Sequence, residues 1–328
     1  MNQDQYHPGF HKLAISTIFV ALTTLIFGAL TTTKNAGMAF PDWPTSDGHF
    51  MITYPWLKDY AVRWDKFLEH GHRLAGILIG IWSIALVVTA QLVERRPRVK
   101  WLAISILLGV ICQGGLGGFR VQLNDRGLAM LHGIFAAIVF SLMGTLVVVT
   151  GKQWRDAAKT PISKPLTAMK VMAVTALGLL CVQYVFGSLI RHRGTGLHEH
   201  LGIGILFPVV AFVNAIISQK CESSWLRRSS WTLLGVASLQ VALGLATWVL
   251  KYGFAATGYV AVADSTQQVI VRTVHMVWGV ITLMTAVVHT VKVYRVAAVS
   301  PATAEPTLEI RRSSSSQQPP LAQPGGAG

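Results

Sequence analysis

Four histidines recur at equivalent places in the chain, and their side chains can do chemistry that the apolar residues around them cannot. His72, His132, His200 and His275 each stand near the start of a long apolar stretch. Imidazole is a frequent ligand of haem iron, and ionisable groups inside such stretches are rare and tend to mark function. Any single one could be an interfacial histidine that hydrogen-bonds to a loop. Four that recur so regularly favour iron ligation, and hence two bis-histidine haem sites.

A small residue follows each of these histidines four positions later, which is about one helical turn away. Such a residue leaves room beside the helix for a bulky flat ligand. The four small residues are Gly76, Ala136, Gly204 and Gly279. His70 and His198 precede two of the histidines by two positions, which is about 200° around a helix. We therefore expect these two side chains to point away from the ligand.

The stretches that carry the histidines belong to a series of eight. The chain has 328 residues, of which 52% are hydrophobic and 13% charged, and a mean hydropathy of +0.49. This is too apolar for a soluble protein of its size, and about 18 or more apolar residues can cross a bilayer as one helix. We predict an all-α integral membrane protein with eight transmembrane helices that form two pseudo-symmetric four-helix bundles. The predicted spans are residues 13–33, 74–93, 101–119, 128–150, 171–190, 201–218, 229–250 and 273–291.

The formal net charge of +14 follows the predicted topology. Most of the 28 lysines and arginines fall in segments on the side of the membrane where the N-terminus lies. Basic residues concentrate on the cytoplasmic side of membrane proteins, so both termini are expected to be cytoplasmic. The charge therefore requires no nucleic-acid partner, although it predicts a modest affinity for anionic lipid headgroups.

Short matches between the two halves of the chain indicate an internal repeat. Residues 27–30 (Phe-Gly-Ala-Leu) resemble residues 186–189 (Phe-Gly-Ser-Leu), and Gln113 and Gly117 match Gln240 and Gly244. Because the matches fall in equivalent spans and in the same order, two duplicated four-helix halves are predicted. The predicted domains are a cytoplasmic N-terminus (1–12), an N-terminal half (13–150), a cytoplasmic linker (151–170), a C-terminal half (171–296) and a disordered tail (297–328).

The halves differ around the first histidine. Glu69 stands three positions before His72 on the same helical face, and Arg73 follows directly, whereas Leu197 and Leu201 occupy the equivalent positions of the second half. Only the first site thus has a carboxylate that can reach the edge of a bound ligand. The alternatives are that Glu69 is a helix-start acid or an i+4 partner of Arg73, and that Arg73 is an interfacial anchor or a partner of a haem propionate.

The motif Glu-x-x-His-Arg at Glu69, His72 and Arg73, the loop at residues 36–44 and the four histidines together resemble the haem A synthase family. The resemblance covers residues 11–296. It implies an enzyme that oxidises the C8 methyl of haem O to a formyl group by two hydroxylations with loss of water. It also implies that partners include a haem O synthase and cytochrome oxidase assembly factors, besides the lipid bilayer.

The resemblance assigns the two halves different roles. His72, His132 and Arg73 would bind haem O as substrate, and His200 and His275 would ligate the iron of a haem B cofactor. Two axial histidines leave no open position on the iron. The favoured mechanism is therefore removal of electrons through the porphyrin, followed by attack of water, with haem B carrying electrons away.

Within that mechanism Glu69 would act as general base or would stabilise developing positive charge. A di-haem b-type electron-transfer protein is the main alternative, because it would need the same histidines without the carboxylate. A haem-delivery protein and a transporter with incidental histidines are further alternatives.

One feature departs from many members of that family, which carry a cysteine pair in the first outer loop. The aligned positions are Phe40 and Ser46, so no disulfide can form there. Trp43, Trp56 and Trp64 of the same loop either cap the substrate or belong to an interfacial belt. No import presequence or cleavable signal precedes the first span, so a bacterial cytoplasmic (inner) membrane is the expected location.

Overall fold

A computed structural model describes residues 6–157 and 166–299 of the chain. Within these residues eight helices are long and apolar enough to cross a membrane, and they correspond one to one to the eight predicted spans. They are α1 (Pro8–Thr33), α2 (Trp64–Val93), α3 (Pro97–Leu123), α4 (Arg126–Thr150), α6 (Leu166–Arg193), α7 (Leu197–Ser218), α8 (Ser224–Tyr252) and α9 (Thr266–Val299). Short elements complete the fold: β1 (Thr45–Ser46), β2 (His49–Phe50), η1 (Trp56–Asp59), α5 (Lys152–Asp156) and η3 (Ala255–Thr257).

The helices extend beyond the predicted spans because charged residues continue the helix past the hydrocarbon core. α2 begins ten residues before the predicted start at residue 74, and α9 ends at Val299, past both the predicted end at residue 291 and the proposed domain boundary at 296. Residues 158–165 of the predicted linker and residues 300–328 of the predicted tail lie outside the described residues.

Local sequence signals set several helix ends. Pro8 and Pro97 stand at the first turns of α1 and α3, where a missing N–H costs no hydrogen bond. Asp125 caps α4 by accepting a hydrogen bond from the N–H of Leu128 at 2.6 Å. Gly253 ends α8 with a φ of +81°, a conformation that glycine adopts without steric cost.

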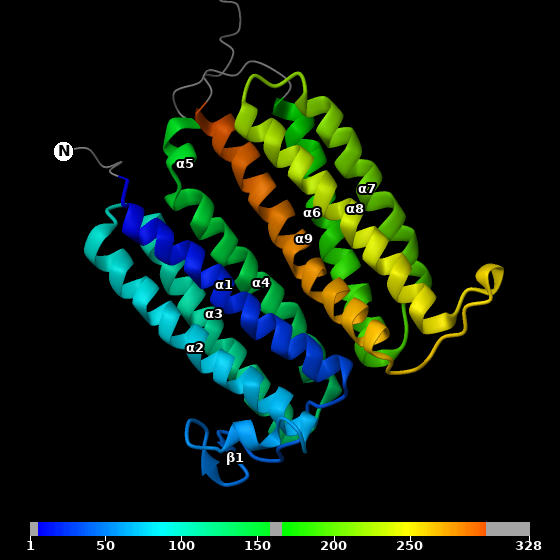
Figure 1. Cartoon of the computed structure of the whole chain (residues 1–328). Coiled ribbons are helices and arrows are strands. Elements are labelled where there is room, and N and C mark those ends of the chain that lie inside the picture. The colour runs from blue at the N-terminus through cyan, green and yellow to red at the C-terminus, as the bar shows by residue number, and fades with distance from the viewer. Residues whose placement is uncertain (1–5, 158–165, 300–328) are drawn as a thin grey trace, which may run out of the picture.

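Each half of the molecule is a closed ring of four helices. α1 packs on α2, α2 on α3, α3 on α4, and α4 on α1; the second half repeats this order with α6, α7, α8 and α9. The halves meet through α4 with α9, α1 with α9, and α4 with α6, which is the contact set of a pseudo-twofold axis that exchanges α1 with α6 and α4 with α9. Figure 1 shows the first half beside the second, with α4 and α9 between them.

Small residues allow the helices to approach closely, as membrane helices require. The fully buried positions at the helix contacts include Ala14, Ala103, Ala137 and Ala286. Gly144 of α4 faces α9, where an added Cβ atom would lie 2.5 Å from the Met284 side chain. Many large apolar side chains face outward instead, as expected of a surface in contact with lipid.

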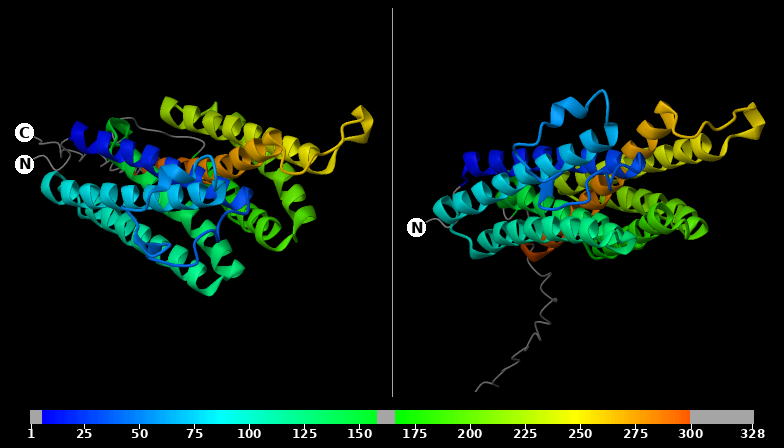
Figure 2. Two further views of the ribbon diagram at one scale, coloured as in Figure 1. Left: turned by 60° about the horizontal axis from the view of Figure 1, so that its bottom comes forward. Right: turned by 90° about the horizontal axis from the view of Figure 1, so that it is seen from below.

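The two ends of the bundle differ. At the end that we call the basic end, α1 begins and α9 finishes, and the predicted cytoplasmic segments gather there. At the opposite end, the loop end, residues 34–63 form a long loop with the antiparallel pair β1–β2 and the turn η1. The loop between α8 and α9 projects beyond the helices at this end (Figure 2). Since α2, α4, α7 and α9 all start at the loop end, their histidines lie toward that end.

Candidate functional site

The structure brings the four histidines together as two pairs, one in each half. The imidazole ring centres of His72 and His132, from α2 and α4, lie 6.0 Å apart with an angle of 79° between the ring planes. The ring centres of His200 and His275, from α7 and α9, lie 6.4 Å apart at 84°. We call these the first and the second histidine pair. Their near-identical geometry follows from the repeated order of helix contacts.

A glycine on the neighbouring helix lies against each imidazole. Added Cβ atoms on Gly28, Gly117, Gly187 and Gly244 would lie 2.8, 3.1, 3.2 and 3.2 Å from the Cε1 atoms of His72, His132, His200 and His275. These glycines come from α1, α3, α6 and α8, the helices that carry no paired histidine. Each imidazole therefore fills the space that a side chain would take on the neighbouring helix.

The residue four positions before each of these glycines also contacts the histidine helix. The Nδ1–H of His72 donates to the carbonyl of Thr24 at 3.0 Å, and that of His200 donates to the carbonyl of Gln183 at 3.3 Å. A proton on Nδ1 leaves the lone pair of the neutral ring on Nε2, the tautomer that a metal ligand requires. In these two histidines the backbone of the partner helix thus leaves Nε2 as the nitrogen that could bind a metal.

Glutamine side chains also form hydrogen bonds between partner helices and the helices that carry the histidines. The Nε2 amide of Gln113 donates to the carbonyl of His132 at 2.8 Å, and that of Gln183 donates to the carbonyl of His200 at 2.9 Å. In α1, Thr24 takes the place of the glutamine, and its hydroxyl donates to the carbonyl of Ala75 at 3.0 Å. A Gln/Thr-x-x-x-Gly pattern therefore recurs on all four partner helices. This four-residue spacing is visible in the sequence. The internal repeat matched only two of its four copies, Gln113 with Gly117 and Gln240 with Gly244.

The donor set of each pair fits a haem iron. Two imidazoles that bind one metal from opposite sides, each at about 2 Å, place their ring centres roughly 6 Å apart, close to the separation in both pairs. His72 and His200 make their hydrogen bonds through Nδ1, and the Nδ1 atoms of His132 and His275 are buried without a hydrogen-bond partner among the described residues. No group of three or more histidine, cysteine, aspartate or glutamate side chains could hold a metal there. Two histidines suffice only where a macrocycle supplies the remaining ligands, as in haem.

Glu69 is buried beside the first histidine pair, with 4% of its surface exposed. One carboxylate oxygen accepts a hydrogen bond from Arg73 at 2.8 Å, and the other accepts the backbone N–H groups of Ala39 at 2.7 Å and Phe40 at 3.4 Å. The i+4 ion pair with Arg73, which the sequence left as an alternative, is therefore formed. A catalytic role for Glu69 stays a prediction.

The guanidinium group of Arg73 forms hydrogen bonds with residues of the long loop. Its Nη1 donates to the carbonyls of Asp42 at 3.0 Å and Thr45 at 2.7 Å, and to the hydroxyl of Ser46 at 3.2 Å. Together with the ion pair to Glu69, these bonds tie the loop to α2 directly above His72. The loop is thus a fixed part of the first site.

Arg120 of α3 is a further charged residue at this site, and the sequence analysis missed it. Its guanidinium donates to the carbonyl of Gly37 and interacts electrostatically with Glu69 and Arg73. A positive charge directly after a predicted span, three residues after Gly117, was the available signal. The first site therefore holds one carboxylate and two guanidinium groups, a net positive charge suited to an acidic ligand group.

The structure distinguishes His70 and His198 from the paired histidines. His70 is fully buried under the loop, where its ring packs on Phe40 and Tyr54 and its Nδ1 lies 3.0 Å from the hydroxyl of Ser46. His198 is exposed. Phe40 and Ser46, the positions aligned with the cysteine pair, are both completely buried. An aromatic core and a hydrogen-bond network thus stabilise this loop in place of a disulfide.

The three tryptophans expected in the loop differ in their surroundings, and Trp64 is the first residue of α2. Trp43 lies against α3, where an added Cβ on Gly118 would be 2.5 Å from its ring. Trp56 donates to the carbonyl of Phe67 at 2.7 Å, and Trp64 is 52% exposed. Trp43 thus packs close to the first histidine pair, while the exposure of Trp64 suits an interfacial residue.

Hydrogen bonds also fix the charge of an acid in this loop. Burial alone would raise the pKa of Asp42, but the backbone N–H groups of Gly48 and Asp47 and the hydroxyl of Thr45 bond to its carboxylate and lower the pKa to about 2. Burial, and then the hydrogen bond to Asp59, raise the pKa of Tyr54. The loop therefore carries an ionised aspartate and a neutral tyrosine at neutral pH.

A model of the COX15-CtaA family, described as cytochrome oxidase assembly protein, matches residues 61–200. This part of the chain, less than half of its length, is similar to that family. The matched range contains Glu69, Arg73 and Arg120, both members of the first histidine pair, and His200 of the second.

Several proteins to which the chain is similar are named heme A synthase. The chain is 28% identical over 191 residues to the heme A synthase of Symbiobacterium thermophilum, covering 56% of this chain and 60% of that protein. It is 27% identical over 195 residues to the one of Bacillus pumilus, covering 56% and 59%. The chain thus spans about three fifths of the length of these relatives. No solved structure matches the chain.

Proposed function

We propose that the protein is a haem A synthase, an oxidoreductase that converts the C8 methyl of haem O to a formyl group. The observation that carries the proposal is that two histidine pairs of nearly the same geometry differ in their charged surroundings. Among the described residues only the first has a buried carboxylate beside it, that of Glu69, which forms an ion pair with Arg73. The heme A synthases among the relatives support this assignment.

We assign the substrate to the first pair and the cofactor to the second. His72 and His132 would hold haem O, with Arg73 and Arg120 beside its acidic edge. His200 and His275 would hold haem B, whose iron can accept and release single electrons. Leu197 and Leu201 stand where the first site has Glu69 and Arg73, so the second site lacks the equivalent carboxylate.

The reaction must remove electrons and add oxygen from water. Each hydroxylation of the methyl carbon consumes one water and releases two electrons and two protons. Two rounds yield a gem-diol, which loses water to leave the formyl group. Electrons would leave through the second site to a one-electron acceptor of the membrane. Protons released near the first site require a base.

Glu69 is the residue that we assign to this role. Arg73 and the N–H groups of Ala39 and Phe40 stabilise its ionised form, and they fix the carboxylate of a residue that stands three positions before His72 on α2. It would accept the proton of the attacking water or stabilise positive charge that develops on the oxidised carbon. The loop at residues 34–63 would keep bulk water away from the same place.

A di-haem electron-transfer protein is the second candidate, because the close likeness of the two histidine pairs also suits two redox centres. The test is to express the chain in a bacterial membrane together with a haem O synthase, to purify it and to identify the extracted haems by mass. Haem A with haem B supports the synthase. Haem B alone, once the supply of haem O is verified, supports the electron carrier, and unconverted haem O supports a delivery protein.

The proposed setting is a bacterial inner membrane with both termini in the cytoplasm. Eight apolar helices make the protein multi-pass, and the basic end would face the cytoplasm. Haem O would enter the first half from the bilayer or by transfer from a haem O synthase. Co-purification of the two proteins would test that partner.

A further inference from the structure

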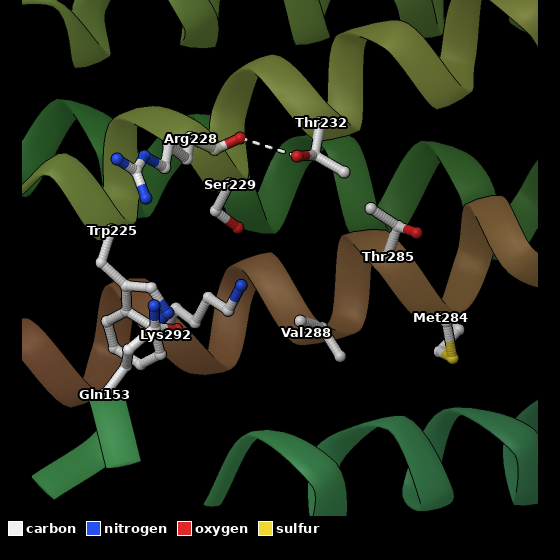
Figure 3. A pocket seen from close by; sticks show the side chains of 9 residues that line it. All are labelled: Gln153, Trp225, Arg228, Ser229, Thr232, Met284, Thr285, Val288 and Lys292. Carbon is white, nitrogen blue, oxygen red and sulfur yellow. Dashed lines mark hydrogen bonds between the residues drawn. The ribbon is translucent and has the colours of Figure 1, made fainter. Parts of the chain in front are cut away.

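A cavity of about 260 Å³ lies at the basic end, on the opposite side of the membrane from the histidine pairs. Side chains from α5, α8 and α9 line it, so it adjoins the contact between the two halves (Figure 3). The residues that matter to the argument are Trp225, Arg228, Thr232, Met284, Val288 and Lys292.

The chemical character of this cavity changes along its length. Met284, Val288 and Lys292 are spaced by four residues and so share one face of α9. Figure 3 shows Arg228 and Lys292 toward one end and Met284 at the other. The apolar end continues into the interface of the halves, since Met284 and Val288 also pack against Gly144 of α4. The cavity is thus cationic near the membrane surface and apolar toward the membrane interior.

The cations of this cavity have no acidic partner among the described residues. The ion pairs found there involve neither Arg228 nor Lys292. The ammonium group of Lys292 lies 5.3 Å from the centre of the Trp225 ring, a cation–π contact that places the charge at the rim of the cavity. Lys292 is partly buried and Arg228 is exposed. A partly buried cation without a counter-ion is unfavourable, and an anion between Lys292 and Arg228 would reduce that cost.

We propose that this cavity binds an anionic phospholipid of the leaflet at the basic end. Arg228 and Lys292 would contact the phosphate, and an acyl chain would lie along Val288 and Met284. The combination of a cationic rim with an apolar interior matches a lipid rather than a free anion, and Trp225 stands where tryptophans mark the headgroup level. Such a lipid would bridge the two halves. This inference does not depend on the proposed function.

Lipid retention by the purified full-length chain tests the proposal. Native mass spectrometry would compare phosphatidylglycerol with phosphatidylcholine of the same acyl chains. We expect phosphatidylglycerol to be retained and to raise the Tm, and phosphatidylcholine to do neither. The double variant Arg228→Gln/Lys292→Gln should bind phosphatidylglycerol roughly thirtyfold more weakly, since each cation near a membrane surface contributes about 1 kcal/mol.

Two controls separate a specific site from a general charge effect. Arg95→Gln/Arg98→Gln removes the same charge from exposed positions at the basic end and should leave lipid binding unchanged. Arg228→Lys/Lys292→Arg keeps both charges and should retain the lipid if the fold is intact. The proposal would be overturned if the two charge-removing variants lost phosphatidylglycerol binding equally. It would also be overturned if the unmodified chain retained both lipids equally. Full displacement of phosphatidylglycerol by millimolar inorganic phosphate would show a free-anion site instead.

Discussion

The imidazole of His72 lies directly against Gly28, so close that a Cβ atom at position 28 would be 2.8 Å from the Cε1 atom of the ring. The same relationship recurs at the other three paired histidines with slightly longer distances. The position of each imidazole is therefore set from the partner helix, by a missing side chain and, for His72 and His200, by a backbone carbonyl as well. Iron ligation tolerates little displacement of a ligand, so these glycines are direct targets for tests.

We expect Gly28→Ala to lower the amount of haem O bound by at least half. The added methyl would push the ring of His72 out of position, and overpacking of this kind costs about 1–3 kcal/mol. Gly117→Ala should act in the same way through His132. Haem content per protein, from the Soret absorbance and from extraction, is the measurement. Gly114→Ala is the matched control, because Gly114 lies on the same helix as Gly117 with nothing within 4 Å of an added Cβ. If Gly114→Ala lost as much haem as Gly117→Ala, helix packing in general and not the histidine contact would be responsible.

We expect His275→Ala to abolish the low-spin haem B spectrum while most haem O binding persists. The two histidine pairs lie in separate rings of helices, so the loss of one histidine from the second pair leaves the first pair in place. The reduced spectrum and the extracted haems of variants in each pair measure this. Unchanged haem B in His275→Ala would refute the assignment of haem B to the second half.

We expect Glu69→Gln to bind haem O but to form haem A at least 100-fold more slowly, in the range for loss of a general base. Glu94→Gln is the matched control, because Glu94 is also 4% exposed and forms an ion pair, with Arg96 at 2.7 Å, but lies at the basic end. Both variants should lower the Tm, since each leaves an arginine without its carboxylate. Only Glu69→Gln should stop oxidation. Equal haem A yields from the two variants would leave Glu69 a purely structural role.

We expect the loop at residues 34–63 to loosen in acid through Asp42. Its pKa is lowered from 3.8 to about 2 in the folded protein, so its stabilising contribution is complete above about pH 4 and is lost as the pH falls through about 2. The rate at which pepsin cuts this loop between pH 4 and pH 2 measures the effect. Asp42→Asn should be cut faster at pH 4 and should show a weaker dependence on pH. An identical pH dependence in the variant would exclude Asp42 as the titrating group.

Sequence alone was enough to predict the eight helices and the two histidine pairs. A transmembrane helix depends on the composition of its own twenty or so residues, because each must satisfy its backbone hydrogen bonds within itself. The regular placement of His72, His132, His200 and His275 on alternate spans then required only the direction of each span. The choice of His72 over His70 rested on the repeat of the four histidines, and the burial of His70 under the loop agrees with it.

Only the tertiary structure decided what surrounds those histidines. The contact of Arg120 with Gly37, the two loop N–H groups that bond to Glu69 and the glycine opposite each imidazole all join segments of different helices and loops. Hydropathy carries no information about which helices become neighbours or how a polar loop folds over them. These features depend on helix packing and on buried hydrogen bonds between residues far apart in sequence, which is why they appear only in the folded protein.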